Sequence, residues 1–359
     1  MTGPRLGFFT RLLERAPAAD RYRFALEQIE AAERHGFASA WVAQHHFGED
    51  EGGLPSPFVL LAAAAQRTER IALATAVVTL PIDDPLRVAE DAAVLDQLSG
   101  GRVQLGIAAG GTPSSFAAFG QDPDLRREIF ADHLGVFVDA LAGRGIRGTA
   151  SRIYPAAGDL AERIWQATFS ASGGRLAGER GDGLLLSRTQ PRESGRPGAP
   201  LHELQLPIIA AYRSALDARG DGAPVRVLAS RTALVVDEEN RTRALELADA
   251  GLRDLARSMF GLDTDGVPID ELVRLTDTHV GTVDEVVASL AADETLGAVS
   301  DVSFQVHSIA ATHELTLRSL ELLATQVAPR LGLQVGGDAA SALHHAHRAL
   351  ISTTSEGTS

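Results

Sequence analysis

The 359-residue chain has no cysteine and no lysine, so all 33 of its basic residues are arginine. Without cysteine it has no thiolate nucleophile, no cysteine-ligated zinc and no iron–sulfur cluster. Without lysine it has no Schiff-base chemistry and no lysine general base. Any chemistry therefore depends on His, Asp, Glu, Ser, Thr or Tyr side chains, or on a bound cofactor.

The chain is acidic, with a formal net charge of −14. This charge argues against nucleic acid and anionic membranes as partners. The first residues lack the layout of a signal peptide, and no apolar run approaches the roughly 20 residues of a membrane span. We therefore expect a cytoplasmic protein. We also expect no bound metal, because His344, His345 and His347 fit a peripheral tail better than a metal site.

Apolar segments that suit buried parallel strands alternate with helical stretches. We expect strands near residues 6–10, 39–43, 71–80, 103–108, 163–169, 183–186, 225–236 and 299–306. Eight strands alternating with helices predict a (β/α)8 TIM-type barrel. A doubly wound open sheet is the alternative, but no glycine-rich dinucleotide fingerprint follows the first strand. We expect one barrel domain over residues 1–331 and a flexible or helical tail over residues 332–359.

Helix ends and irregular loops can also be read from the sequence. Asp84 followed by proline predicts an N-cap, and Gly100 predicts the end of the same helix. Asp20 is expected to cap the first helix. Residues 188–200 and 259–281 look irregular, and either segment could form a mobile lid over the barrel mouth.

Residues 57–66 predict a helix that is apolar on all sides. A barrel helix normally buries only one face, so the second face predicts a subunit contact and a homodimer. Cover by a loop of the same chain is the alternative.

In a barrel, active sites lie at the carboxyl ends of the strands. The expected ends carry Thr10, Gln44, His45, His46, Thr79, Leu80, Ala108–Gly111, Ser170, Ser187–Thr189, Gln305 and His307. This set lacks the clustered carboxylates of a glycosidase or a magnesium site. His45 and His46 are neighbours on a strand, so they point to opposite faces and cannot both ligate one metal. We expect one of them to face the mouth.

Two loops of small residues suit a phosphate. Phe169-Ser-Ala-Ser-Gly-Gly-Arg175 ends a strand and opens a helix, where hydroxyls and free N–H groups meet the positive end of the helix. Gly110-Gly-Thr-Pro-Ser-Ser115 is a similar loop. Two such loops on neighbouring strands suggest a phosphorylated cofactor.

Several longer motifs carry a family resemblance. They are Trp41–Phe47, Thr75–Pro81, Leu95–Gly106, Phe116–Gly120 and residues 306–322. From residue 6 to about 331, the chain resembles the bacterial-luciferase-like family of flavin-dependent monooxygenases. Residues 164–170, 181–191 and 228–231 resemble a narrower subgroup, described only as FMN-dependent luciferase-like monooxygenases.

This resemblance implies a barrel that binds reduced FMN (FMNH2) at the strand ends, usually delivered by a separate flavin reductase. Oxygen adds to flavin C4a, and the resulting (hydro)peroxide oxidises a small organic substrate. An F420-dependent oxidoreductase on the same fold and a catalytically silent flavin-binding subunit are the alternatives. F420 has a longer, polyglutamate-bearing tail that wants a basic groove, for which the chain offers only residues 188–196.

The resemblance also implies roles for individual residues. His45 matches the catalytic histidine of the family, and Ala76-Val77 matches a non-proline cis peptide that lies against the flavin ring. Ser170, Gly173 and Gly174 fall where the family binds the flavin phosphate. The expected cofactor-binding residues are Ala76, Val77, Thr79, Ala108, Gly110, Ser170, Gly173, Gly174, Arg175 and Arg188.

The chain departs from luciferases proper at four positions. An acid, a reactive cysteine, a phosphate-binding arginine and an active-site histidine of luciferases fall at Gln44, Ala108, Ala109 and Asp84, respectively. These differences argue against light emission from a long-chain aldehyde. We hypothesise that Arg175 or Arg188 replaces the missing arginine as the phosphate partner.

Overall fold

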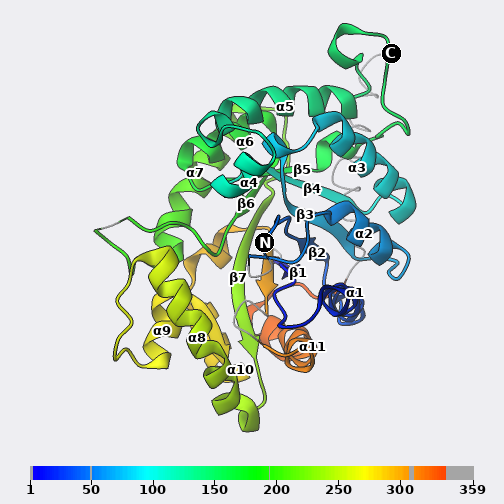
Figure 1. Ribbon diagram of the computed structural model, residues 1–359. Helices are drawn as coiled ribbons and strands as arrows, with labels where there is room; N and C mark the ends of the chain where they lie inside the picture. The colour runs from blue at the N-terminus through cyan, green and yellow to red at the C-terminus, as the bar shows by residue number, and fades with distance from the viewer. Residues whose placement is uncertain (1–2, 49–50, 194, 307–310, 337–359) are drawn as a thin grey trace, which may run out of the picture.

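The computed structural model describes residues 3–48, 51–193, 195–306 and 311–336 (Figure 1). Within them, eight parallel strands pair side by side into a closed ring. In ring order they are β1 (Arg5–Thr10), β2 (Ser39–Val42), β3 (Ala72–Thr79), β4 (Val103–Ala108), β5 (Ile164–Ala167), β6 (Gly183–Leu186), β7 (Val227–Val235) and β9 (Asp301–Gln305). Pairing of β6 with β7 and of β9 with β1 closes the ring. The predicted (β/α)8 barrel and its eight strands are confirmed.

A ninth strand, β8 (Thr278–Gly281), lies outside this ring and was not predicted. It pairs with the second half of β7, from Thr232 to Val235, whereas β9 pairs with the first half. Residues 259–281 therefore include β8 and the helix α9 (Ile269–Leu275), so the prediction of an irregular segment is wrong there. In residues 188–200, by contrast, the described residues form neither helix nor strand.

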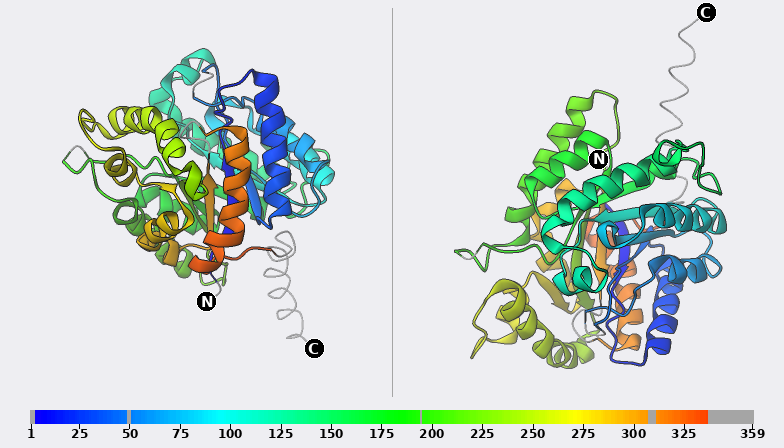
Figure 2. Two further views of the ribbon diagram at one scale, coloured as in Figure 1. Left: turned by 90° about the horizontal axis from the view of Figure 1, so that it is seen from below. Right: turned by 45° about the horizontal axis from the view of Figure 1, so that its top comes forward.

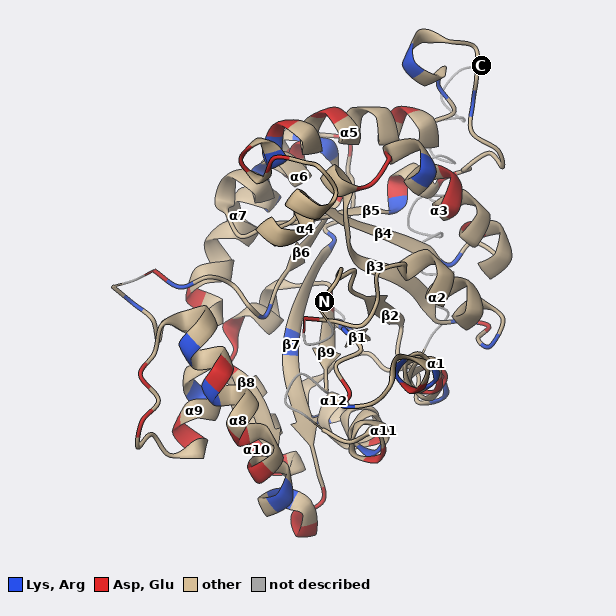
Figure 3. Cartoon of the chain, in the orientation of Figure 1, with Lys and Arg blue, Asp and Glu red and all other residues tan. Residues whose placement is uncertain are grey.

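Helices cover the outside of the barrel, as Figures 1 and 2 show. They are α1 (Ala18–Arg34), α2 (Pro57–Ala65), α3 (Pro85–Ser99), α4 (Pro113–Ala118), α5 (Arg126–Leu141), α6 (Ala171–Arg180), α7 (Leu201–Arg219), α8 (Arg241–Phe260), α10 (Val283–Ala291), α11 (His313–Leu322) and α12 (Ala328–Leu331). The first and last parts of the ring meet where His313 of α11 stacks on Phe24 of α1, with ring centroids 4.2 Å apart. Charged residues gather on these helices and their loops, and the barrel strands are mostly uncharged (Figure 3).

The caps of two helices test the sequence prediction. Asp84 accepts hydrogen bonds from the N–H groups of Leu86 (2.8 Å) and Arg87 (3.3 Å), and Gly100 ends α3 with φ of +69°, as predicted. Asp20 is not a cap. Helix α1 starts two residues earlier, after Pro17, and Asp20 lies in its first turn.

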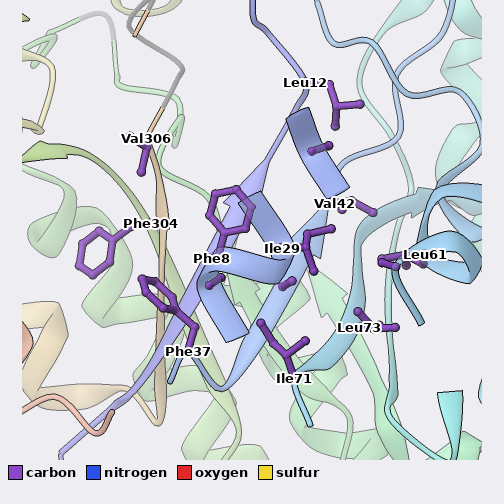
Figure 4. Close-up of a cluster of buried hydrophobic side chains, with 14 of the residues drawn as sticks. Phe8, Leu12, Ile29, Phe37, Val42, Leu61, Ile71, Leu73, Phe304 and Val306 are labelled. Atoms are coloured by element: carbon purple, nitrogen blue, oxygen red, sulfur yellow. The ribbon is translucent and has the colours of Figure 1, made fainter. Parts of the chain in front are cut away.

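The core has two layers, one between the strands and the helices and one inside the barrel. Between the strands and helices lie residues such as Phe8, Ile29, Leu61, Leu73 and Phe304 (Figure 4). Inside the barrel, Trp41 and Trp165 meet edge to face at 5.4 Å, packed with Ala74, Leu185 and Leu228. The two indole N–H groups donate to Ser39 and Gln104, at 2.8 and 2.9 Å. These satisfied bonds make the tryptophans a packed plug, so a ligand enters from the carboxyl ends of the strands.

Helix α2 buries one face and exposes the other. Leu60, Leu61 and Ala64 are buried, but Val59 is 72% exposed and Ala63 is also exposed. No loop of the described chain covers Val59, so the alternative of cover by the same chain is not what the structure shows. None of the helices in the described part of the chain has the length and apolar character needed to cross a membrane.

Candidate active site at the barrel mouth

His45 follows β2 at the mouth of the barrel and is held against a glycine. Its backbone N–H donates to the carbonyl of Leu54 at 2.9 Å. A Cβ atom on Gly52, which has φ of +151°, would lie only 2.7 Å from Cδ2 of the imidazole. The loop can therefore close over His45 only with glycine at this position.

The environment of His45 keeps its imidazole neutral. Burial lowers the pKa of His45 to about 3, and the positive charges of Arg11, His46 and Arg188 act in the same direction. At physiological pH the ring therefore has one nitrogen that can accept a proton and one that can donate a hydrogen bond.

This low pKa makes stability depend on pH. In the unfolded chain His45 titrates near 6.5, so between pH 6.5 and 3 the unfolded state binds a proton that the folded state does not. As far as His45 determines it, the free energy of unfolding is therefore highest above pH 6.5 and falls as the pH is lowered toward 3. We expect the free energy of unfolding to fall by about 2 kcal/mol more between pH 7 and pH 5 in the wild type than in His45→Gln. Urea unfolding at both pH values measures this; His202→Gln, on α7, is the control, and equal pH slopes for wild type and His45→Gln would contradict the assignment.

His46 contacts different elements from His45. Its ring lies 4.8 Å from that of Phe119, edge to face, and next to Phe47. Its Nε2 atom is buried and has no partner within the described chain. The two histidines thus face different surroundings, as their adjacent positions predict, and His45 is the one beside Arg11 and Arg188.

Gln44 ties the ends of two strands together. Its Oε1 accepts from the backbone N–H of Thr79 at 2.7 Å, and its Nε2 donates to Asp83 Oδ2 at 2.8 Å. The amide thereby fixes the loop that carries His45 to the end of β3. Here Gln44, which stands where luciferases have an acid, has a structural function.

Five of the predicted cofactor residues lie together at the ends of β3 and β4. The Ala76–Val77 bond is a cis peptide, and the pairing of β3 with β4 shifts between Thr75 and Val78 at that place. Thr79 then pairs with Ala108. Gly110 has φ of +75°, and a Cβ atom there would lie 2.4 Å from the Thr79 methyl carbon. The result is a floor of small side chains, Ala76, Val77, Thr79, Ala108 and Gly110, of which Ala76 and Val77 pack against the tryptophan plug.

The predicted phosphate loop forms the start of α6. Ser170 is the N-cap, its Oγ accepts from the N–H of Gly173 at 3.2 Å, and it lies 3.1 Å from the Ser172 hydroxyl. Both hydroxyls are exposed. A Cβ atom on Gly173 would lie 2.0 Å from the Thr168 hydroxyl, and one on Gly174 would lie 2.7 Å from the carbonyl of Ile208 in α7. Gly174 is thus explained by helix packing as well as by a phosphate, and its own N–H donates to the Ser170 carbonyl.

The structure separates the two arginines that were considered as phosphate partners. Arg175 is exposed on α6 and pairs with Glu179 at 2.5 Å. Arg188 is buried at the mouth, where its Nε donates to Gln305 Oε1 at 2.7 Å. Only Arg175 lies on the helix whose start forms the phosphate loop.

Arg11 belongs to this site and was missed in the sequence. It follows β1, its carbonyl accepts from Gly53 at 3.0 Å, and its Nη2 donates to the carbonyl of Glu51. Its Nε is buried without a partner in the described chain, and burial lowers its pKa. The signal was present, because Arg11 lies one residue beyond the strand end Thr10.

The remaining predictions concern a bound metal and four further histidines. Among the described residues, no three His, Asp or Glu side chains gather as a metal site. His307, His344, His345 and His347 lie outside the described residues.

Comparison with known proteins gives a consistent result. The profile of the family described as luciferase-like monooxygenase matches residues 7–313. The chain is 31% identical over 338 residues to 4-hydroxyprotoasukamycin monooxygenase of Streptomyces nodosus subsp. asukaensis, covering 88% of each chain.

Solved structures agree in fold. The crystal structure of monooxygenase RslO1 from Streptomyces bottropensis superposes with a TM-score of 0.75 at 25% identity, covering 91% of this chain and 99% of that one. The oxygenating constituent of 3,6-diketocamphane monooxygenase from Pseudomonas putida, solved in complex with FMN, gives a TM-score of 0.74 at 20% identity, with 93% and 99% covered. The second likeness is one of fold only.

Proposed function

The chain belongs to the luciferase-like monooxygenase family, and from this premise we propose that it uses reduced FMN to insert one oxygen atom of O2 into a small organic substrate. The main support is the half-buried, neutral His45, whose neighbour Gln44 bonds the end of β3, two residues beyond the cis peptide. The loop that carries a proton-accepting group is thereby tied to the strand whose end would face a flavin ring.

The residues at the mouth fit FMN. Ser170, Ser172 and the start of α6, with Arg175, would hold the phosphate, and the floor formed by Ala76, Val77, Thr79, Ala108 and Gly110 would face the ring. Gln305 Nε2 and Gln190 Oε1 are buried without partners in the described chain, so a donor and an acceptor are available for the polar edge of a cofactor. When bound, reduced FMN supplies the electrons that activate O2.

The role of the protein is to position the reactants and move a proton. The neutral nitrogen of His45 accepts a proton from the reacting group or returns it. The plug of Trp41 and Trp165 closes the barrel below, which keeps water from that side.

The contacts of the loop at residues 188–196 favour FMN over F420. Arg192 stacks on Phe260 at 4.1 Å and pairs with Asp277, and Arg196 pairs with Glu203. Arg188 is turned into the mouth. These arginines therefore do not form the open basic groove that would bind the polyglutamate tail of F420. The retained His45 favours an enzyme over a silent subunit.

We further propose a cytoplasmic homodimer that receives FMNH2 from a separate flavin reductase. The dimer contact would include the open face of α2 with Val59 and Ala63 and the adjacent helix α3, where Val94 and Leu98 are 44% and 50% exposed. Four exposed apolar side chains on two adjacent helices are typical of a surface that another subunit covers.

Replacing Ala63 by Glu should give monomers. A carboxylate in the centre of an apolar contact would be buried without a partner, which costs several kcal/mol. Sedimentation velocity measures the change, and Leu176→Glu, at an equally exposed apolar position on α6, is the control. An Ala63→Glu variant that sediments like the wild type would remove this face from the proposal.

Anaerobic titration with reduced FMN, followed by rapid mixing with oxygenated buffer, tests the proposed function. We expect saturable binding and then an oxygen-dependent absorption transient that differs from both reduced and oxidised FMN. Reoxidation at the rate of free flavin, or no binding, would contradict the proposal. F420 in the same titration distinguishes the alternative cofactor.

A further inference from the structure

Two arginines, the buried Arg188 and the half-buried Arg11, lie at the mouth after different strands. Arg11 follows β1 and Arg188 follows β6, and both act electrostatically on the imidazole of His45. They also act on each other. Burial lowers the pKa of Arg188 to about 9, and the nearby charge of Arg11 adds to this effect. A second positive charge thus acts on the buried cation of Arg188, which is unfavourable unless an anion compensates it.

Arg188 differs from the other buried arginines in its partners. Arg163, Arg192 and Arg231 each pair with an aspartate. Arg102 donates to several backbone carbonyls and to a threonine hydroxyl, and Arg21 and Arg226 donate to backbone carbonyls. Arg188, only 8% exposed, has one neutral acceptor in the described chain, Gln305 Oε1, at its Nε atom. Its two Nη groups have no acceptor in the described chain, and a bound anion would supply one.

Among the described residues, no carboxylate forms an ion pair with either arginine. Glu51 acts on Arg11, but it contacts Arg11 through its backbone carbonyl, and it is an exposed residue. Asp83 acts on His46 and accepts a hydrogen bond from Gln44, and the imidazoles of His45 and His46 carry no negative charge. The described part of the mouth is therefore cationic, in a chain whose net charge is −14.

Next to His45 there is space for an organic group. A cavity of about 190 Å³ is lined by His45, Phe47, Gly52, Gly53 and Pro55, among others. The N–H of Gly53 donates to the carbonyl of Arg11, so the cavity and the arginine share a backbone contact. His45 thus lines this small cavity, together with Arg21, and lies close enough to Arg11 and Arg188 for their charges to act on it.

We propose that Arg11 and Arg188 bind the carboxylate of an organic acid, which is the substrate of this enzyme. The forked guanidinium groups match a planar carboxylate, and desolvated charge-assisted hydrogen bonds are strong. For a phosphate, the proposed site is elsewhere, at the start of α6. The proposal rests on the proposed function only in naming the acid as substrate. The anionic ring of reduced flavin is the other source of a planar anion.

Calorimetric titration without flavin tests the site directly. The probes are acetate, hexanoate and benzoate, each paired with its neutral amide. We expect at least one acid to bind with at least tenfold preference over its amide. Arg11→Met and Arg188→Met should each weaken the binding of that acid by about 10- to 100-fold, which corresponds to the loss of a charge-assisted hydrogen bond. Arg196→Gln, in the same loop but exposed and paired with Glu203, should bind like the wild type.

Thermal unfolding without ligand shows whether Arg188 is structural. Because Arg188→Met removes an uncompensated buried cation, we expect its Tm to equal or exceed that of the wild type. A lowered Tm together with retained benzoate binding would overturn the proposal. The proposal would also be overturned if the acids bound no more tightly than their amides. The same holds if they bound both methionine variants as tightly as the wild type.

Titration of the same variants with oxidised and reduced FMN separates the two sources of anion. If both variants weaken the binding of reduced FMN and leave the binding of the acid unchanged, the two arginines bind the cofactor and the substrate proposal is wrong. The acid titrations need neither flavin nor oxygen. Their outcome is therefore independent of the oxygen-mixing experiment that tests the proposed function.

Discussion

His45→Ala should lower the rate of substrate oxidation by about 10²- to 10⁴-fold, the usual contribution of a positioned acid–base group. The imidazole is neutral because burial and the neighbouring cations lower its pKa to about 3, so it is ready to accept a proton at neutral pH. FMN affinity should change little, because the floor lies on β3 and β4 and the phosphate loop starts α6.

Two measurements separate these effects. Single-turnover oxidation after rapid mixing gives the rate, and anaerobic titration gives the dissociation constant of FMNH2. His46→Ala is the matched control, since its ring packs on Phe119 and lies outside the cationic pair. If His45→Ala lost flavin affinity and rate in parallel, His45 would be a binding residue and its catalytic role would be wrong.

The barrel itself was predictable because its strands are buried on both faces. Such strands read as continuous apolar runs, and the runs that became β3 and β4 are bounded by clear helix signals at Asp84 and Gly100. Strand β8 was not predictable in this way. Its residues, Thr278-His-Val-Gly281, do not form an apolar run, and it pairs with the second half of β7, which extends beyond the pairing with β9.

Of the site residues, only those at strand ends or within the family motifs could be predicted from the sequence. His45 and the residues of the floor follow from their places after β2, β3 and β4. The direction of the Arg188 side chain does not, because it depends on Gln305 at the end of β9, 117 residues away. The same holds for Gly174, whose neighbour Ile208 belongs to another helix. Contacts of this kind are set by tertiary packing, and no local pattern encodes them.

The largest effect on stability is expected at Asp96, which anchors the bottom of the barrel. Asp96 on α3 accepts from both terminal nitrogens of Arg163, at 2.8 and 2.7 Å, and from the N–H of Val103 at 3.2 Å. Both side chains are about one-tenth exposed. Asp96→Ala would leave the buried Arg163 with two backbone carbonyls, of Gly101 and Val103, and with Asp159, whose side chain is 36% exposed. We expect the free energy of unfolding to fall by about 3–5 kcal/mol.

Urea unfolding of a small set of variants checks this expectation. Asp159→Ala removes the exposed partner of the same arginine, and it should cost about 1 kcal/mol or less. The double variant Asp96→Ala/Arg163→Met should be more stable than Asp96→Ala alone, because it also removes the orphaned charge. If Asp96→Ala and Asp159→Ala cost the same, the buried pair contributes no more than a surface one, and the link between α3 and β4 depends on packing alone.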